Sequence, residues 1–138
     1  RHLSATMKTE KQMRDFLKKK GYLPAVCDYV LEKLRGYGFV DDAEYSAQYV
    51  QAAGRRKGAR LIALELKSRA VAEEQVEAAL DGLEGEEEAA KAMLQKYMRG
   101  KEPTRENLSK AYRHLLSKGF SYETAKDALA SPGAEEEE

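Results

Sequence analysis

Apolar residues recur three and four positions apart along most of this chain, and no stretch alternates apolar and polar residues for long. This spacing is typical of amphipathic α-helices. Pro and Gly stand between the apolar runs rather than inside them, as expected for turns. We therefore predict an all-α protein with eight helices, at about residues 9–20, 24–35, 42–53, 59–69, 73–80, 86–99, 105–118 and 122–130.

Several helix starts carry their own signals. Residues with side chains suited to N-caps precede four of the helices, namely Thr9, Asp41, Thr104 and Ser121. Gln12 and Glu44 each follow such a residue at the three-residue spacing of a capping box. Pro24 suits the first position of the second helix.

A weak internal repeat appears when the sequence is shifted by 49 residues. Three columns carry it: Leu17, Leu66 and Leu115; Gly21, Ala70 and Gly119; and Tyr22, Val71 and Phe120. The same order of helix, turn and helix recurs at each step, and the alignment needs no gap. We predict an elongated array of tandem three-helix, helix-turn-helix-like repeats with a truncated last repeat. The predicted parts are a flexible segment 1–8, repeats at 9–57, 58–103 and 104–131, and a disordered acidic tail at 132–138.

Composition narrows the class of protein. Lys and Arg together number 24, as do Asp and Glu, so no overall field steers the chain toward nucleic acid. No apolar run reaches the length of a membrane span, and we expect no membrane association. The single cysteine, Cys27, fits a reducing compartment and a cytoplasmic location.

Candidate catalytic chemistry is sparse. Cys27 lies in an apolar helical run and is expected to be a buried small hydrophobe. His114 lies within a helix, and two distant histidines with one cysteine do not make a zinc-binding spacing. The pair Asp41–Asp42 is better explained as a helix cap than as a metal site. We expect no enzyme activity, no metal and no cofactor.

Two basic clusters are candidate binding surfaces. The first is expected to contact phosphates or carboxylates through Arg55, Arg56, Lys57, Arg60, Lys67 and Arg69. Arg56, Arg60 and Lys67 would share a face if one helix runs through them. The second, for which an ordinary solvated helix face is equally compatible, comprises Lys11, Arg14 and Lys18. Tyr45 and Tyr49, four residues apart, are expected in the core or between repeats.

The central block "LEKLRGYGFVDDAEYSAQYV…RRKG…LIALELKSR" resembles the RecX family, the regulators of the bacterial RecA recombinase. The residues that match the family pattern are Gly38, Val40, Asp41, Asp42, Tyr45, Ala47, Tyr49, Val50, Gly58, Ile62, Glu65 and Leu66. Near the end, "LLSKGFSYETAKDAL" is similar to the family's final segment. Ala70 stands where the family usually has Gly. Gly38, Asp41, Asp42, Tyr45, Tyr49 and Gly58 are expected to be structural.

The resemblance implies a modulator, mainly an inhibitor, of RecA. Such a protein binds the RecA–DNA filament along its helical groove and damps ATP hydrolysis, strand exchange and co-protease activity. The implied partners are the RecA filament and single- or double-stranded DNA. We expect the protein to be a monomer. Two alternatives remain open: a helix-turn-helix DNA-binding protein that acts without recombinase, and a helical scaffold for a peptide.

Overall fold

The structure is a computed structural model that describes residues 8–130, and over this range it contains eight helices and no strand. The helices are α2 (Glu10–Lys19), α3 (Pro24–Gly36), α4 (Asp42–Ala53), α5 (Ala59–Ser68), α6 (Glu73–Leu80), α7 (Glu86–Met98), α8 (Arg105–Ser117) and α9 (Tyr122–Leu129). Each predicted helix is confirmed, with ends within one residue. The predicted segment 1–8 and tail 132–138 lie, apart from residue 8, outside the described residues.

The four predicted N-caps are present, because each side chain accepts a hydrogen bond from the backbone amide three residues on. The donors are the amides of Gln12, Glu44, Asn107 and Thr124. At Thr9 the Gln12 side chain accepts in return from the Thr9 amide at 3.0 Å, which completes the capping box. At Asp41 the capping box is incomplete, because the Glu44 side chain accepts from the Gln48 side chain rather than from the Asp41 amide.

The 49-residue repeat marks the C-terminal ends of three helices. Gly21, Ala70 and Gly119 have positive φ values of 96°, 64° and 96°. In each case the following residue donates its backbone amide to the leucine of the first repeat column, as Val71 does to Leu66 at 3.2 Å. This pair of features is the Schellman motif. The columns seen in the sequence are therefore the parts of one recurring helix stop.

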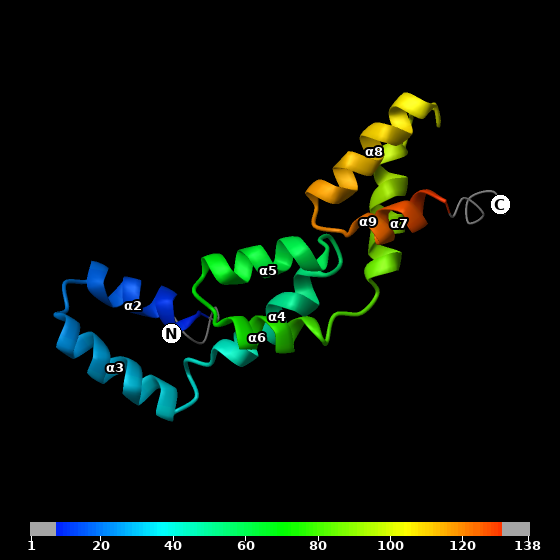
Figure 1. Cartoon of the computed structure of the whole chain (residues 1–138). Helices are drawn as coiled ribbons and strands as arrows, with labels where there is room; N and C mark the ends of the chain where they lie inside the picture. The colour runs from blue at the N-terminus through cyan, green and yellow to red at the C-terminus, as the bar shows by residue number, and fades with distance from the viewer. Residues whose placement is uncertain (1–7, 131–138) are drawn as a thin grey trace.

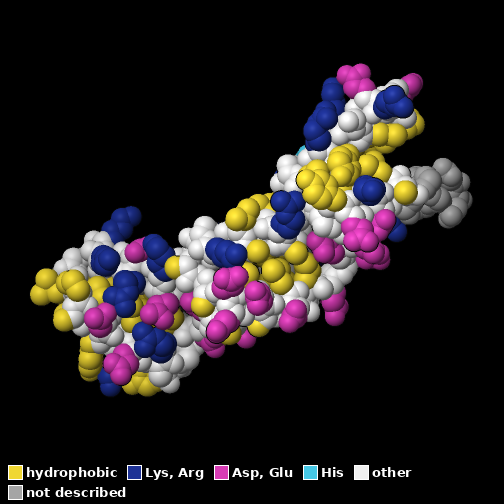
Figure 2. Space-filling view, viewed as in Figure 1, with side chains coloured by type: hydrophobic (Ala, Val, Ile, Leu, Met, Phe, Trp, Pro, Cys, Tyr) yellow, Lys and Arg dark blue, Asp and Glu magenta, His cyan; other side chains and the backbone are white. Residues whose placement is uncertain are grey.

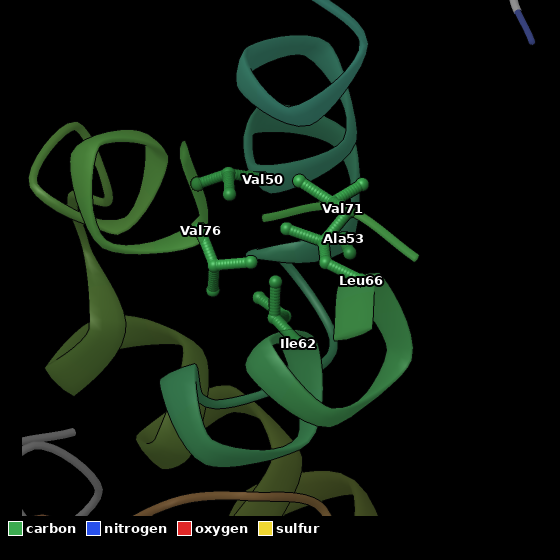
Figure 3. Packing of buried hydrophobic residues seen from close by; sticks show 6 residues of the cluster. All are labelled: Val50, Ala53, Ile62, Leu66, Val71 and Val76. Atoms are coloured by element: carbon green, nitrogen blue, oxygen red, sulfur yellow. The ribbon is translucent and has the colours of Figure 1, made fainter. Parts of the chain in front are cut away.

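Buried side chains form three clusters, one for each group of helices. The middle cluster joins α4, α5 and α6 through Val50, Ala53, Ile62, Leu66, Val71 and Val76 (Figure 3). The C-terminal cluster joins α7, α8 and α9, and the N-terminal cluster joins α2 and α3. Cys27 belongs to the N-terminal cluster and is fully buried.

This packing corrects the predicted repeat boundaries. α4 packs against α6, and α7 packs against α9, so the middle and C-terminal units each begin one helix earlier than predicted. The boundaries at 57/58 and 103/104 fall inside packed units, and the C-terminal unit has all three helices rather than a truncated set. Within the described residues it is the N-terminal unit that has only two. There Tyr22 is 52% exposed, whereas its repeat counterparts Val71 and Phe120 are 4% and 0% exposed.

The three units follow one another in an elongated chain (Figure 1). The middle and C-terminal units meet where Gly58 donates its amide to the carbonyl of Lys118 at 2.8 Å. A Cβ on Gly58 would lie 2.4 Å from the carbonyl carbon of Gly119, so this approach requires glycine. The N-terminal unit is joined by Asp42, whose Oδ1 accepts from the Glu10 amide at 2.9 Å. Among the described helices, none combines the length and apolar character needed to cross a bilayer.

Candidate interaction surface

The first basic cluster spans a turn and a helix rather than one continuous helix. α4 ends at Ala53 and α5 begins at Ala59, with Gly58 as its N-cap. Arg55 and Arg56 therefore lie in the turn, and the predicted common helical face holds only for Arg60 and Lys67.

Two of the six predicted binding residues are engaged within the protein. The Nζ atom of Lys57 donates to both oxygens of Glu65, at 2.9 and 2.8 Å. The Tyr49 hydroxyl also donates to Glu65. The guanidinium of Arg69 lies 4.5 Å from the centre of the Tyr49 ring, a cation–π contact. Tyr45 stacks on Tyr49 with ring centres 6.2 Å apart.

This arrangement fixes the charge of its members. Partial burial opposes ionisation of Glu65, but the hydrogen bonds from Lys57 and Tyr49 outweigh it and lower the pKa of Glu65. The hydrogen bond to Glu65 raises the pKa of Lys57. Lys57 and Glu65 are thus both charged at neutral pH. Together with Tyr49 and Arg69 they attach α5 to α4, which is a structural task.

The other four cations form the exposed part of the cluster. Arg55, Arg56, Arg60 and Lys67 are exposed, and no described carboxylate pairs with any of them. Leu64 lies between Arg60 and Lys67 at helical spacing and is 65% exposed. We call Arg55, Arg56, Arg60, Leu64 and Lys67 the basic stripe. Its combination of three planar guanidinium groups, one ammonium group and one large apolar side chain suits contact with phosphates or with a protein surface.

The second basic cluster is largely neutralised within the N-terminal unit. Lys11 pairs with Asp15 and Arg14 pairs with Asp28, each at 2.8 Å. The hydrogen bond from Lys11 is the main cause that lowers the pKa of Asp15. Lys18 is exposed and has no such partner among the described carboxylates. This cluster has the character of a solvated helix face, and its role in binding stays a prediction.

The remaining motif residues take part in turns and junctions. Gly38 ends α3 with a φ of 81°, and Asp41 caps α4. Asp42 joins two units, as described above, and its burial raises the pKa of its carboxyl group. Gly58 lies in the junction with Gly119. His114 is partly buried and stacks on Tyr97, with ring centres 4.8 Å apart. Among the described residues, no three or more His, Cys, Asp or Glu side chains are grouped so that they could hold a metal ion.

The chain also carries an acidic segment, which was not predicted from the sequence. Residues 73–88 contain eight carboxylates and no Lys or Arg: Glu73, Glu74, Glu77, Asp81, Glu84, Glu86, Glu87 and Glu88. This segment comprises α6, the α6–α7 turn and the start of α7. Asp and Glu side chains gather along the lower edge of the molecule in the view of Figure 2. A windowed charge count would have found it, although the overall charge is zero.

These features define an all-helical protein of tandem three-helix units with a cationic stripe on its middle unit. Three domain models of one family match in chain order: the first, second and third three-helix domains of RecX, over residues 1–34, 41–80 and 84–129. The chain therefore belongs to the RecX family. The second and third matches coincide with the packed units α4–α6 and α7–α9.

Individual relatives agree with this assignment. The chain is 32% identical over 133 residues to regulatory protein RecX of Clostridium botulinum strain Alaska E43, covering 92% of this chain and 63% of the relative. It is 36% identical over 142 residues to that of Geobacillus sp. strain WCH70, covering 99% and 52%. The chain thus spans between half and two thirds of these relatives. They are named as regulatory proteins, in agreement with the expectation that the chain is not an enzyme.

Solved structures show the same fold. A crystal structure of regulatory protein RecX superposes with a TM-score of 0.82 at 30% identity, covering 91% of this chain and 64% of the other. RecX from Lactobacillus salivarius gives the same TM-score at 23% identity, covering 94% and 88%, and supports the fold alone. The predicted all-α repeat architecture and the predicted family are confirmed.

Proposed function

We propose that this chain is a non-enzymatic modulator, mainly an inhibitor, of RecA. It binds the RecA–DNA filament along its helical groove and damps ATP hydrolysis, strand exchange and co-protease activity. The observation that carries the proposal is membership of the RecX family over most of the chain. The elongated array of units supports it (Figure 1).

The physical basis is contact with several sites at once. An extended body can reach neighbouring subunits of a filament, and each added contact raises the overall affinity without one tight site. The basic stripe supplies the electrostatic contact, to DNA phosphate or to carboxylates of the filament. Contacts to phosphate release counterions, so the affinity for the filament should fall as salt rises.

The first test is the DNA-dependent ATPase of the cognate RecA, titrated with this protein at fixed single-stranded DNA. Inhibition well below one protein per RecA subunit would support a modulator that caps or bridges the filament. Inhibition only near one to one would favour coating of the groove. No inhibition by a folded protein would contradict the proposal, and tight duplex binding without RecA would then favour the DNA-binding alternative.

The role of the basic stripe needs a separate variant. Arg56→Glu with Arg60→Glu reverses two exposed charges that have no partner among the described residues, so folding should be unaffected. We expect about a tenfold rise in the concentration needed for half-inhibition, since two close charge contacts are lost. The control, Arg105→Glu with Lys126→Glu, makes the same change of charge in the C-terminal unit. Equal effects of both pairs would show that only net charge matters.

A further inference from the structure

A groove lies between α4 and the α6–α7 turn, at the boundary of the middle and C-terminal units. Its volume is about 760 Å³. It is lined mostly by small or apolar side chains, which we call its floor, including Ala47, Val50, Ala78, Ala79, Leu83 and Ala89. Small side chains let the backbone of a bound segment approach closely, as in grooves that accept an amphipathic helix.

Two of the three charged residues that line this groove are acidic, and we call these two its acidic rim. Glu84 and Glu88 line it, with Arg55 as the single cation among its lining residues. The surrounding segment, residues 73–88, has eight carboxylates and no cation. Of these, Glu86 caps α5 by accepting from the Ala59 amide at 3.0 Å, whereas none of the other seven forms an ion pair with a described residue. Such a concentration of one charge is self-repulsive, and an occupant of opposite charge relieves the repulsion.

The charge of the rim decides between classes of occupant. Carboxylates repel nucleic-acid phosphates, so the charge of this groove favours a protein occupant over DNA. A metal ion is not indicated, because no described His, Cys, Asp and Glu residues are grouped so that they could hold one. An apolar floor with an acidic rim fits a segment that carries apolar side chains on one face and Lys or Arg beside them.

We propose that this groove is a second docking surface, which binds a Lys- or Arg-bearing amphipathic helical segment of the protein partner. This inference rests on the proposed function, in which that partner is RecA. The basic stripe and the acidic groove, which share only Arg55, then contact different components of the nucleoprotein filament. α5, which carries the helical part of the stripe, packs against α6, and the two helices follow the upper and lower edges of the middle unit in the view of Figure 1.

One pair of variants tests the floor of the groove. Ala47 is exposed and lines the groove, so Ala47→Phe fills it without entering the core. The control is Ala52→Phe, at an exposed position of the same helix that does not line the groove. We expect Ala47→Phe to weaken binding to cognate RecA, measured by biolayer interferometry, about tenfold. The control should bind within about twofold of the unchanged protein.

A second pair tests the rim. Glu84→Lys with Glu88→Lys reverses the charge at the groove, and Glu74→Lys with Glu77→Lys makes the same change on α6 outside it. We expect the first pair to weaken RecA binding about tenfold and the second pair by less than threefold. Neither pair should weaken binding to single-stranded DNA, because each removes negative charge.

The outcomes separate this inference from the proposed function. If the unchanged protein inhibits RecA and Ala47→Phe binds RecA equally well, the groove is not a docking surface while the proposed function stands. Equal losses from both lysine pairs would overturn the inference too, because they would indicate only a solvated acidic face. If the unchanged protein neither binds nor inhibits RecA, both proposals fail together.

Discussion

Ala70 is the single described residue other than glycine with a positive φ, at 64°. Its repeat counterparts are Gly21 and Gly119, at the same position of the Schellman motif. An L-residue in this region has its Cβ close to the following carbonyl oxygen, which costs roughly 1–2 kcal/mol. The hydrogen bonds of Ala70 and Val71 and the burial of Val71 hold the turn in place despite this cost.

We therefore expect Ala70→Gly to raise the free energy of unfolding by about 1 kcal/mol, since the strain is removed and part of the gain is lost to the greater freedom of the unfolded chain. Urea denaturation measures this change. The control is Ala78→Gly, at an exposed position inside α6, which should lower the stability by about 0.5–1 kcal/mol. A loss of stability in Ala70→Gly would contradict the role given to the turn.

His114 should make stability depend on pH. Burial, followed by the charge of Lys118, lowers its pKa in the folded protein below the ordinary value of 6.5. The unfolded chain therefore binds more protons around that value, so stability falls as pH drops through about 6.5 and levels off below the folded pKa.

The midpoint of urea unfolding should therefore be lower at pH 5.5 than at pH 7.5. His114→Gln should remove most of that difference, because glutamine does not titrate. Asp42 works in the opposite direction at lower pH, since its pKa is raised by burial and its protonation favours the folded state. A pH dependence unchanged in His114→Gln would contradict this account of His114.

At the scale of the helix, the sequence was sufficient to predict the elements because the determinants are local. Thr9, Asp41, Thr104 and Ser121 mark helix starts through bonds that span three residues. Gly21 and Gly119 mark helix ends in the same local way. Such signals depend little on tertiary structure, so the predicted ends agree with those observed.

The grouping of the helices could not be predicted in this way. A repeat of 49 residues gives the spacing of equivalent helices but does not say which helix begins a unit. That depends on which helices pack together, and here α4 covers α6 while α7 covers α9. These contacts are made between helices separated by a third one. The register of the repeat was therefore right, whereas the boundaries of the units were one helix late.

The junction between the middle and C-terminal units depends on two glycines. We expect Gly58→Ala to lower the free energy of unfolding by about 2 kcal/mol, because its Cβ would overlap the backbone at Gly119 and force the units apart. The control is Gly36→Ala, whose Cβ would have no atom within 4 Å. Thermal unfolding of both variants checks the difference. Similar melting temperatures for the two would show that the junction yields without cost.

At the scale of the whole molecule, overall neutrality concealed a separation of charge. The basic cluster of 54–69 was apparent in the sequence, but the contacts of Lys57 and Arg69 within the protein were not. Both depend on Tyr49 or Glu65, which the turn after α4 brings alongside them. The acidic segment 73–88 begins on α6, along the lower edge of the middle unit in these views, and continues into the start of α7 (Figures 1 and 2).

Two contact surfaces of opposite charge on one molecule lead to a prediction about mixtures of variants. If the basic stripe and the acidic groove bind different parts of the filament, each raises the effective concentration of the other only within the same molecule. A protein with Arg56→Glu and Arg60→Glu retains the groove, and Ala47→Phe retains the stripe. An equimolar mixture of these two proteins should therefore inhibit the ATPase of RecA no better than either protein alone at the same total concentration.

The contrary result is equally definite. If both surfaces are needed but can act from different molecules, the mixture supplies both contacts in trans and inhibition should rise above that of either variant. The unchanged protein at half the total concentration is the matched control, since it contains the same number of intact stripes and intact grooves as the mixture. A mixture as potent as this control would show that the extended body contributes nothing by joining the two surfaces. A mixture about tenfold weaker would indicate that covalent connection of the surfaces is what makes the protein an inhibitor.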